Sequence, residues 1–183
     1  ECAVESLKAV GEGGYNVLGV VTVPDRKIGR GQKVGCSPVK QYAEEHSLPL
    51  LQPESLKDSD FLKELETFEA DLFVVVAFRM LPKVVWSMPR LGTFNLHASL
   101  LPAYRGAAPI NWAVINGETR TGVTTFLLDE HMDTGSILFQ EEEEILPEDN
   151  VGRLYDRLMI RGAALVLRTV DALESGTAVP RPQ

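Results

Sequence analysis

Three side chains of the sequence could act together in acid–base chemistry: Asn95, His97 and Asp133. A histidine exchanges protons near neutral pH, an asparagine amide can donate to a developing oxyanion, and a carboxylate can hold charge on an imidazole. Because the set contains no obvious nucleophile, it suits direct transfer of an acyl group to an incoming amine. Ser99 and the cysteines are not needed for this step. The alternative is that Asn95 and His97 only end a strand and that Asp133 only makes a turn.

The elements that position these side chains are strands of a buried sheet. The Val-rich run Tyr15–Val23 predicts a strand buried on both faces, Asp71–Ala77 predicts a buried strand most strongly, and Gly92–His97 predicts a shorter one. Asn95 and His97 lie two residues apart at the end of this last run, so they point to the same side. Ligands of open α/β sheets bind beyond the carboxyl ends of the strands. The sequence therefore predicts an amide and an imidazole side by side at such a crevice.

The remaining elements alternate between helix and strand, which predicts an α/β fold with a mostly parallel twisted sheet and helices on both faces. The basic, Gly- and Pro-rich segment Pro24–Lys40 is predicted to be largely a loop. A short strand is expected at Leu48–Leu51, and two runs predict an antiparallel pair at a sheet edge, Thr121–Leu128 and Gly135–Glu142. Apolar spacing and capping residues predict helices at Cys2–Val10, Ser37–His46, Asp58–Phe68 and Val151–Leu173.

Composition excludes several classes of protein. The 183 residues carry 18 Lys and Arg against 26 Asp and Glu, a net charge of −8, which argues against a uniformly basic nucleic-acid coat. No apolar run approaches the roughly 20 residues of a membrane span. Cys2 and Cys36 are too few for a disulfide scaffold and lack metal-ligand spacing, so we expect a reducing, cytoplasmic location and no metal. The acidic run Glu141–Glu144 is typical of a solvated strand edge.

Longer motifs surround the three polar residues. The stretch Phe94–Asn111 reads FNLHASLLPAYRGAAPIN, Leu128–Gly135 reads LDEHMDTG, and Gly122–Thr125 reads GVTT. Together they resemble the folate-dependent formyltransferases, in a pattern N-x-H-x-SLLP-x-x-RG followed by D-x-x-x-DTG. The resemblance extends over nearly all of the chain. The segments Pro24–Lys33, PDR-x-x-GRG-x-K, and Ser37–Lys40, SPVK, resemble the members of this family that act on methionyl-tRNA.

This resemblance implies a Rossmann-like formyltransferase fold and a function. It implies that Asn95, His97 and Asp133 form a catalytic trio that moves the formyl group of 10-formyltetrahydrofolate, a co-substrate, to the α-amino group of initiator methionyl-tRNA. It also implies a protein that is monomeric and not bound to membranes. Arg30 would contact the acceptor end of the tRNA, with Arg26 and Lys33 beside it. The residues it implies for substrate and folate binding are Phe78, Arg79, Met80, Leu81, Pro82, Ser99, Leu100, Leu101, Pro102, Asp129, Glu130, His131 and Met132.

The binding residues have plainer interpretations. Phe78, Met80 and Leu81 follow a buried strand and could simply belong to the core. The segment Asp25–Lys40 holds five basic side chains and one aspartate, as a solvated loop could. Its local charge nevertheless opposes that of the whole chain, and local potential governs attraction to phosphates, so this segment is where we expect the end of an RNA.

The ends of the chain depart from the family pattern. The opening strand of the family, with its Gly-Thr-Pro turn, is expected before Glu1 and is absent from the sequence, so the sheet is expected to lack a strand. We expect residues 1–176 to form an N-terminally incomplete formyltransferase catalytic domain. Residues 177–183 read as the start of a linker to a C-terminal β-barrel domain that the sequence does not contain.

Other functions share parts of these motifs. A formyltransferase for a small amine such as glycinamide ribonucleotide, or a formyltetrahydrofolate hydrolase, would use the same trio, and the basic PDR…GRG segment favours tRNA over both. A nucleotide-binding Rossmann module without catalysis would need G-x-G-x-x-G, but Val34 stands where the third glycine should be after Gly29 and Gly31. An RNA-binding protein without chemistry would bury Asn95 and His97 against core backbone.

Overall fold

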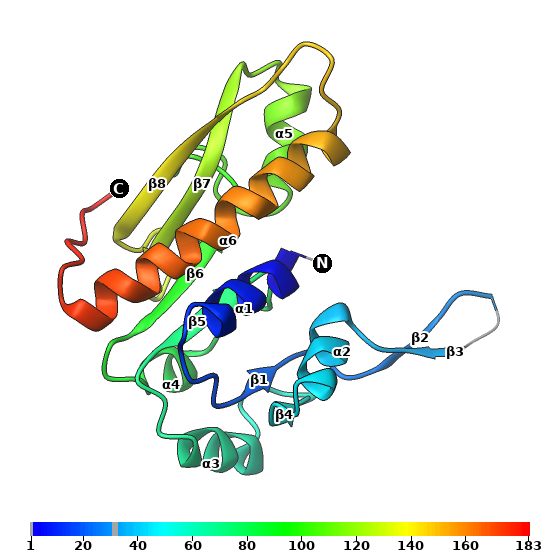
Figure 1. Ribbon diagram of the computed structural model, residues 1–183, viewed down its shortest axis with the longest axis vertical. Helices are drawn as coiled ribbons and strands as arrows, with labels where there is room; N and C mark the ends of the chain where they lie inside the picture. The colour runs from blue at the N-terminus through cyan, green and yellow to red at the C-terminus, as the bar shows by residue number, and fades with distance from the viewer. Residues whose placement is uncertain (1, 31–32) are drawn as a thin grey trace.

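The largest sheet of the molecule has four strands in the order β5-β6-β7-β8 (Figure 1). The computed structural model describes residues 2–30 and 33–183. In it β5 (Phe73–Val76) runs parallel to β6 (Thr93–His97), whereas β7 (Arg120–Leu127) and β8 (Ile137–Glu144) continue the sheet in antiparallel pairing. The predicted antiparallel pair at a sheet edge is therefore confirmed.

A second parallel pair lies beside this sheet. β1 (Val20–Val21) pairs with β4 (Leu50–Leu51), and the helices α2 (Pro38–Glu45) and α3 (Ser59–Thr67) follow these strands in the chain. The strand predicted at Tyr15–Val23 is shorter in the structure, because within the described residues only its Val20–Val21 part finds a ladder partner. The alternation of parallel strands and helices confirms the predicted α/β class.

The basic segment contains a hairpin that the sequence analysis did not predict. β2 (Arg26–Ile28) and β3 (Lys33–Gly35) pair in antiparallel register and project from the body of the molecule (Figure 1). Gly29 has φ +76°, a left-handed conformation that lets the chain reverse between them. A hairpin without a core face has no need of alternating apolar residues, so its sequence carries no strand pattern.

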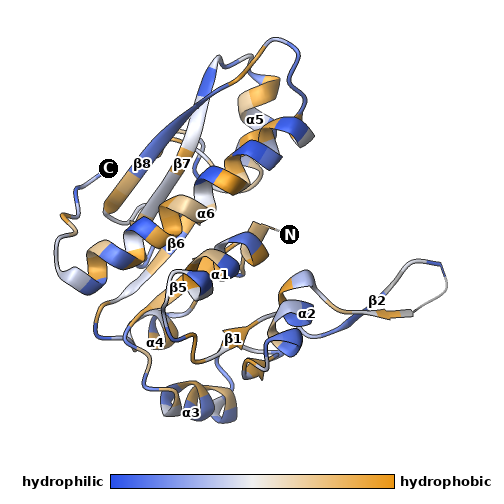
Figure 2. Cartoon of the chain, viewed as in Figure 1, coloured by the Kyte–Doolittle hydropathy of each residue, from blue (hydrophilic) through white to orange (hydrophobic). Residues whose placement is uncertain are grey.

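The long helix α6 (Val151–Ser175) packs with α1 (Cys2–Glu12) and the large sheet around the main core. Its N-cap Asn150 accepts a hydrogen bond from the backbone of Arg153, and Gly176 ends it in a left-handed conformation. Figure 2 shows β8 changing from hydrophobic at its first residues to hydrophilic at its acidic end. The core therefore supports the half of β8 that adjoins the loop carrying Asp133.

The remaining helices are α4 (Lys83–Trp86) and α5 (Pro109–Ile115), which follow β5 and β6. The helices α2 and α3 each begin at a side-chain N-cap: Ser37 accepts from the backbone of Lys40, and Asp58 from that of Phe61. No helix within residues 2–30 and 33–183 is long and apolar enough to span a membrane.

Candidate active site

β6 carries Asn95 and His97 at its carboxyl end, between β5 and β7. Asn95 is in register with Val75 on one side and with Phe126 on the other, so it lies in the middle of the sheet. Its side-chain Oδ1 is buried and has no hydrogen-bond partner among the described residues. Buried polar atoms are normally paired, and those that are not often lie at functional sites. An unpaired amide oxygen is therefore available to a ligand at this point.

The imidazole of His97 is 7% exposed and lies between two oxygen atoms. Its Nε2 is 2.8 Å from the carbonyl oxygen of Tyr104, and its Nδ1 is 3.7 Å from Oδ2 of Asp133. A carbonyl oxygen only accepts hydrogen bonds, so Nε2 carries the hydrogen and the neutral ring has its lone pair on Nδ1. A separation of 3.7 Å is too long for a hydrogen bond, as expected when two acceptors face each other.

Asp133 belongs to the Asp133 loop, residues 129–135 between β7 and β8. Its Oδ2 accepts a hydrogen bond of 2.8 Å from the backbone N–H of Gly106, and its own backbone is left-handed, with φ +54°. Gly135 closes the loop against β7, where a Cβ would lie 1.5 Å from the carbonyl oxygen of Leu127. Within the loop, Oδ1 of Asp129 accepts from the backbone of His131 and from the hydroxyl of Thr134. The loop thus has a defined shape that aims the Asp133 carboxylate at His97.

The SLLP turn, Ser99–Pro102, is fixed by hydrogen bonds of its own. The hydroxyl of Ser99 is fully buried and donates to the carbonyl of Ala103 at 2.6 Å, so it is engaged in the turn. Thr124 donates to the Ser99 carbonyl at 2.6 Å, and Gln140 donates to the Leu101 carbonyl at 2.8 Å. Sequence reasoning missed Thr124 and Gln140, although Thr124 stands in register with His97 across the sheet.

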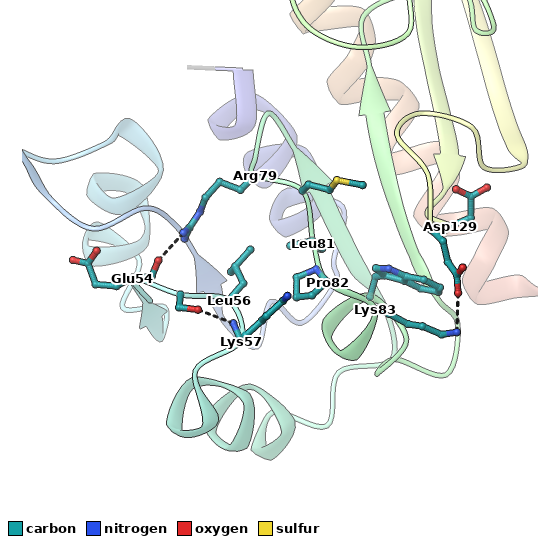
Figure 3. A pocket seen from close by; sticks show the side chains of 12 residues that line it. Glu54, Leu56, Lys57, Arg79, Leu81, Pro82, Lys83 and Asp129 are labelled. Atoms are coloured by element: carbon teal, nitrogen blue, oxygen red, sulfur yellow. Dashed lines mark hydrogen bonds and ion pairs between the residues drawn. The ribbon is translucent and has the colours of Figure 1, made fainter.

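A pocket of about 590 Å³ opens beyond the carboxyl ends of β4 and β5 (Figure 3). Of the residues expected to bind substrate or folate, its lining includes Arg79, Met80, Leu81, Pro82, Asp129 and Glu130. Phe78 packs against the second core cluster instead, and the SLLP turn, His131 and Met132 are not in the lining. The trio is also outside it. The lining residues that sequence reasoning missed are Glu54, Ser55, Leu56, Lys57, Lys83 and Trp86.

Two contacts frame this pocket, and Figure 3 shows both regions. The guanidinium of Arg79 donates to the carbonyls of Pro53 and Glu54, each at 3.0 Å, and so ties the segment after β5 to the segment after β4. Lys83 on α4 pairs with Glu130 of the Asp133 loop at 2.9 Å and lowers the pKa of that carboxyl. Ligands bind beyond the carboxyl ends of parallel strands, and this rule, applied to β4, could have predicted the lining residues 54–57 that follow it.

Arg26 lies on β2, Lys33 on β3 and Arg30 between them. Figure 1 shows this hairpin projecting away from β6, the strand that carries Asn95 and His97. Arg26 and Arg30 are exposed, whereas the side chain of Lys33 lies outside the described part of the structure. At the base of the hairpin, Lys40 pairs with Asp25 at 2.5 Å and lowers the pKa of its carboxyl, and Gln52 donates to the same carboxylate at 3.0 Å. The structure therefore brings His97 and Asp133 together, but it does not bring the predicted RNA-binding residues to them.

Comparisons with known proteins identify the family of this chain. The sequence matches the formyl transferase family over residues 1–170. It is 62% identical over 181 residues to the methionyl-tRNA formyltransferase of Bacteroides thetaiotaomicron, in an alignment that covers 99% of this chain and 56% of that protein. The chain thus spans about half the length of the curated relatives that it matches.

Solved structures share the fold at lower identity. The phosphoribosylglycinamide formyltransferase of Bacillus halodurans superposes with a TM-score of 0.80 at 23% identity, covering 95% of this chain and 90% of that one. An N-formyltransferase from Helicobacter canadensis, solved in complex with folinic acid and dTDP-3-aminofucose, gives a TM-score of 0.72 at 23% identity. That match covers 100% of this chain and 64% of the other. The predicted Rossmann-like formyltransferase fold is confirmed, in a mixed form: two of the three ladders in the four-stranded sheet are antiparallel where a mostly parallel sheet was expected.

Proposed function

Because this chain belongs to the formyl transferase family, we propose that its protein transfers the formyl group of 10-formyltetrahydrofolate to the α-amino group of methionyl-tRNA. The observation that carries the chemistry is the approach of His97 Nδ1 to Asp133 Oδ2 at 3.7 Å, with Asn95 on the same strand. The choice of methionyl-tRNA is supported by relatives of that name at about 60% identity.

The tautomer of His97 decides which atom acts as the base. Since Nε2–H donates to Tyr104, Nδ1 accepts the proton of the attacking amine. The proton then lies between Nδ1 and the Asp133 carboxylate, and the two facing acceptors become an ion pair. Asp133 therefore stabilises the charge that forms on His97 during the transfer and need not be protonated itself.

Asn95 acts on the formyl group. Its amide Nδ2 donates to the oxygen that gains negative charge when the amine nitrogen bonds to the formyl carbon. Its Oδ1, unpaired among the described residues, can accept a hydrogen bond from the amine. The co-substrate supplies the formyl carbon and leaves as tetrahydrofolate when its bond to that carbon breaks and its nitrogen regains a proton.

The pocket between α4 and the segment after β4 is the proposed folate site. Its volume lies within the usual range of ligand pockets, roughly 300–1,000 Å³, and its lining combines apolar surface with charged and polar side chains that can orient a ligand. Leu56, Leu81 and Trp86 supply apolar surface, while the Asp133 loop contributes Asp129. Because the same loop carries Asp129 to the pocket and Asp133 to His97, a folate seated there can present its formyl group to the trio.

The hairpin is the proposed contact with tRNA. Arg26 and Arg30 are exposed on a projecting element, and RNA phosphates attract such a local positive charge. We also expect the protein to be a monomer.

The test uses the full-length protein, 10-formyltetrahydrofolate and either methionyl-tRNA or glycinamide ribonucleotide. We expect formylation of the tRNA alone. Arg30→Ala is expected to slow it strongly and to reduce its salt slope by about one counterion, while folate hydrolysis by water changes little. Lys63→Ala, an equal charge change on α3, is the control and should have no effect. Formylation of only the nucleotide would instead assign the protein to the small-amine formyltransferases.

A further inference from the structure

Residues 177–183 return along β8 toward the Asp133 loop (Figure 1). Arg181 forms an antiparallel bridge with Ile137: its N–H donates to the Ile137 carbonyl at 2.9 Å, and the Ile137 N–H donates back at 2.7 Å. The guanidinium of Arg181 also donates to Oε1 of Gln140 at 2.9 Å. This pairing with the start of β8 brings Gln183 to the Asp133 loop.

The side-chain amide of Gln183 makes four hydrogen bonds there. Its Nε2 donates to the carbonyls of Asp133, at 2.7 Å, and Gly135, at 2.9 Å. Its Oε1 accepts from Nε and Nη2 of Arg105, at 3.1 and 2.8 Å. Both donors and both acceptor lone pairs of the amide are therefore used. The side chain joins the loop before β8 to the segment that follows the SLLP turn.

These bonds close a ring around the carboxylate of Asp133. Arg105 precedes Gly106 in the chain, and it is the Gly106 N–H that donates to Oδ2 of Asp133. The ring runs from Gln183 through Arg105 and Gly106 to the Asp133 carboxylate, and back through the Asp133 carbonyl to Gln183. We infer that Gln183 is a positioning residue that holds the Asp133 carboxylate opposite Nδ1 of His97, an inference that rests on the proposed function of this pair.

The arrangement of the pair explains why such a support is needed. When the His97 ring is neutral, its Nδ1 lone pair and the carboxylate of Asp133 lie 3.7 Å apart with no hydrogen bond between them, so the pair does not hold the carboxylate in place. Asp133 also adopts φ +54°, a conformation that persists in a non-glycine residue when its surroundings enforce it. The ring supplies that constraint on both the backbone and the side chain of Asp133.

Glutamine is the residue type that this position requires. A glutamate could accept from Arg105 but could not donate to the carbonyls of Asp133 and Gly135. Methionine has a similar length and none of these hydrogen bonds. Gln183→Met and Gln183→Glu therefore remove the ring in two ways, the second keeping its link to Arg105. Val179→Ala, at a 78% exposed position of the same segment, is the matched control.

The kinetic test measures kcat and KM for methionyl-tRNA and 10-formyltetrahydrofolate in the full-length enzyme and its variants. Small misplacements of catalytic groups can cost about 100-fold in rate, so we expect both Gln183 variants to lose about 10- to 100-fold in kcat. KM values should change less than about twofold, since Gln183 lies outside the pocket lining. Val179→Ala should match the wild type. Unchanged kcat in both Gln183 variants would overturn the inference.

A second readout does not depend on activity. Amide hydrogen exchange, followed by NMR, should become about tenfold faster at Gly106 in Gln183→Met, because the Asp133 acceptor loses its support. The backbone N–H of Leu127, which donates to the Ser136 carbonyl at 2.9 Å at the end of β7, should keep its exchange rate. Unchanged exchange at Gly106 would overturn the inference. If the wild-type enzyme transferred no formyl group, the proposed function would fail, and exchange at Gly106 alone would then decide the role of Gln183.

Discussion

The loops at the two ends of β8 each hold a nearly buried aspartate, and the two carboxylates differ in how many hydrogen bonds they accept. Asp149 follows the strand, is 2% exposed in its side chain, and accepts two bonds from Arg157, at 2.8 and 2.6 Å, and one from the backbone of Leu146 at 2.8 Å. Asp133 precedes the strand, is 11% exposed, and accepts one bond from Gly106 while facing His97. Only the second carboxylate has capacity left for a proton-transfer partner.

The difference extends to the strand between them. Glu141 and Glu143 pair with arginines of α6, as in the 2.5 Å contact of Arg161 with Glu143. The acidic run 141–144, predicted as a solvated edge, is therefore partly an ion-pair network against the helix. Arginine donors on both oxygens of Asp149 lower the pKa of its carboxyl to about 2, and they occupy the oxygens that a proton-transfer partner would need. The comparison of the two ends shows that a candidate site is indicated by a nearly buried charged group whose hydrogen-bonding capacity is not filled by other protein groups.

The largest effect is expected at the imidazole. His97→Ala removes the proposed base, and loss of a positioned acid–base group costs about 100- to 10,000-fold in rate. Formylation of methionyl-tRNA by the full-length enzyme is the measurement, with folding checked by circular dichroism. His46→Ala, an exposed histidine stacked on Tyr42, is the control and should keep full activity. Turnover near the wild-type value in His97→Ala would contradict the claim that His97 beside Asp133 is the base, and with it the functional difference between the two ends of β8.

Asn95→Ala is expected to lower kcat by about 100- to 1,000-fold, because a donor to a developing oxyanion acts chiefly in the transition state. Folate affinity, measured by calorimetry, should change much less. Asn95→Asp should be slower still, since it puts a negative charge where another develops. A loss of folate binding with unchanged rate would show that Asn95 belongs to the binding site instead.

The Gly135→Ala variant tests whether the loop before β8 depends on close backbone packing. The loop after β8 depends instead on the ion pair of Asp149 with Arg157. A Cβ at Gly135 would meet the Leu127 carbonyl at 1.5 Å, so backbone must move. We expect a loss of about 3 kcal/mol in the free energy of unfolding, measured with denaturant. Gly11→Ala in α1 has only an ordinary contact of 3.9 Å with Tyr42 and should stabilise slightly. Equal stability of the two variants would contradict the close approach seen at Gly135.

The smallest effect concerns the pH dependence of stability. Asp149 has a folded-state pKa of about 2, below its ordinary 3.8, so its ionised form stabilises the fold above the ordinary value. That contribution is lost as the pH falls through the interval toward 2. We expect Asp149→Asn to lower the thermal midpoint near neutral pH, by a difference that shrinks below about pH 4. A difference that does not vary with pH would contradict this account of Asp149.

Local patterns were enough to predict most elements. The strand before Ala77, the paired β7 and β8, and the capped helix α6 are confirmed because their signals lie within single segments. The burial predicted for the first of these is wrong: in β5 only Val75 is buried, and Val74 is 37% exposed. The β2–β3 hairpin was missed because the described side chains of its strands, such as Val34 at 68% exposed, show little burial. Apolar periodicity reports burial, and a projecting hairpin has little of it.

The site was harder to predict than the fold. Asn95 and His97 could be placed together because strand alternation fixes their direction. Asp133 was proposed from its Gly-containing loop and then matched the family motif. The distance from Asp133 to His97 depends on a loop whose shape Gly135 sets. Contacts between distant segments, such as Gln183 with Asp133, leave no local signal. The pocket wall after β4 was missed for the same reason.

The most direct test of the central claim is the exchange of each aspartate at the ends of β8 for asparagine. In Asp133→Asn the new amide can donate to Nδ1 of His97 and so block the base. We predict at least about a 100-fold loss of kcat for methionyl-tRNA formylation, with a thermal midpoint within a few degrees of the wild type. Asp149→Asn should do the reverse, lowering the midpoint and keeping kcat. Wild-type turnover in Asp133→Asn would contradict the claim that this carboxylate serves the chemistry.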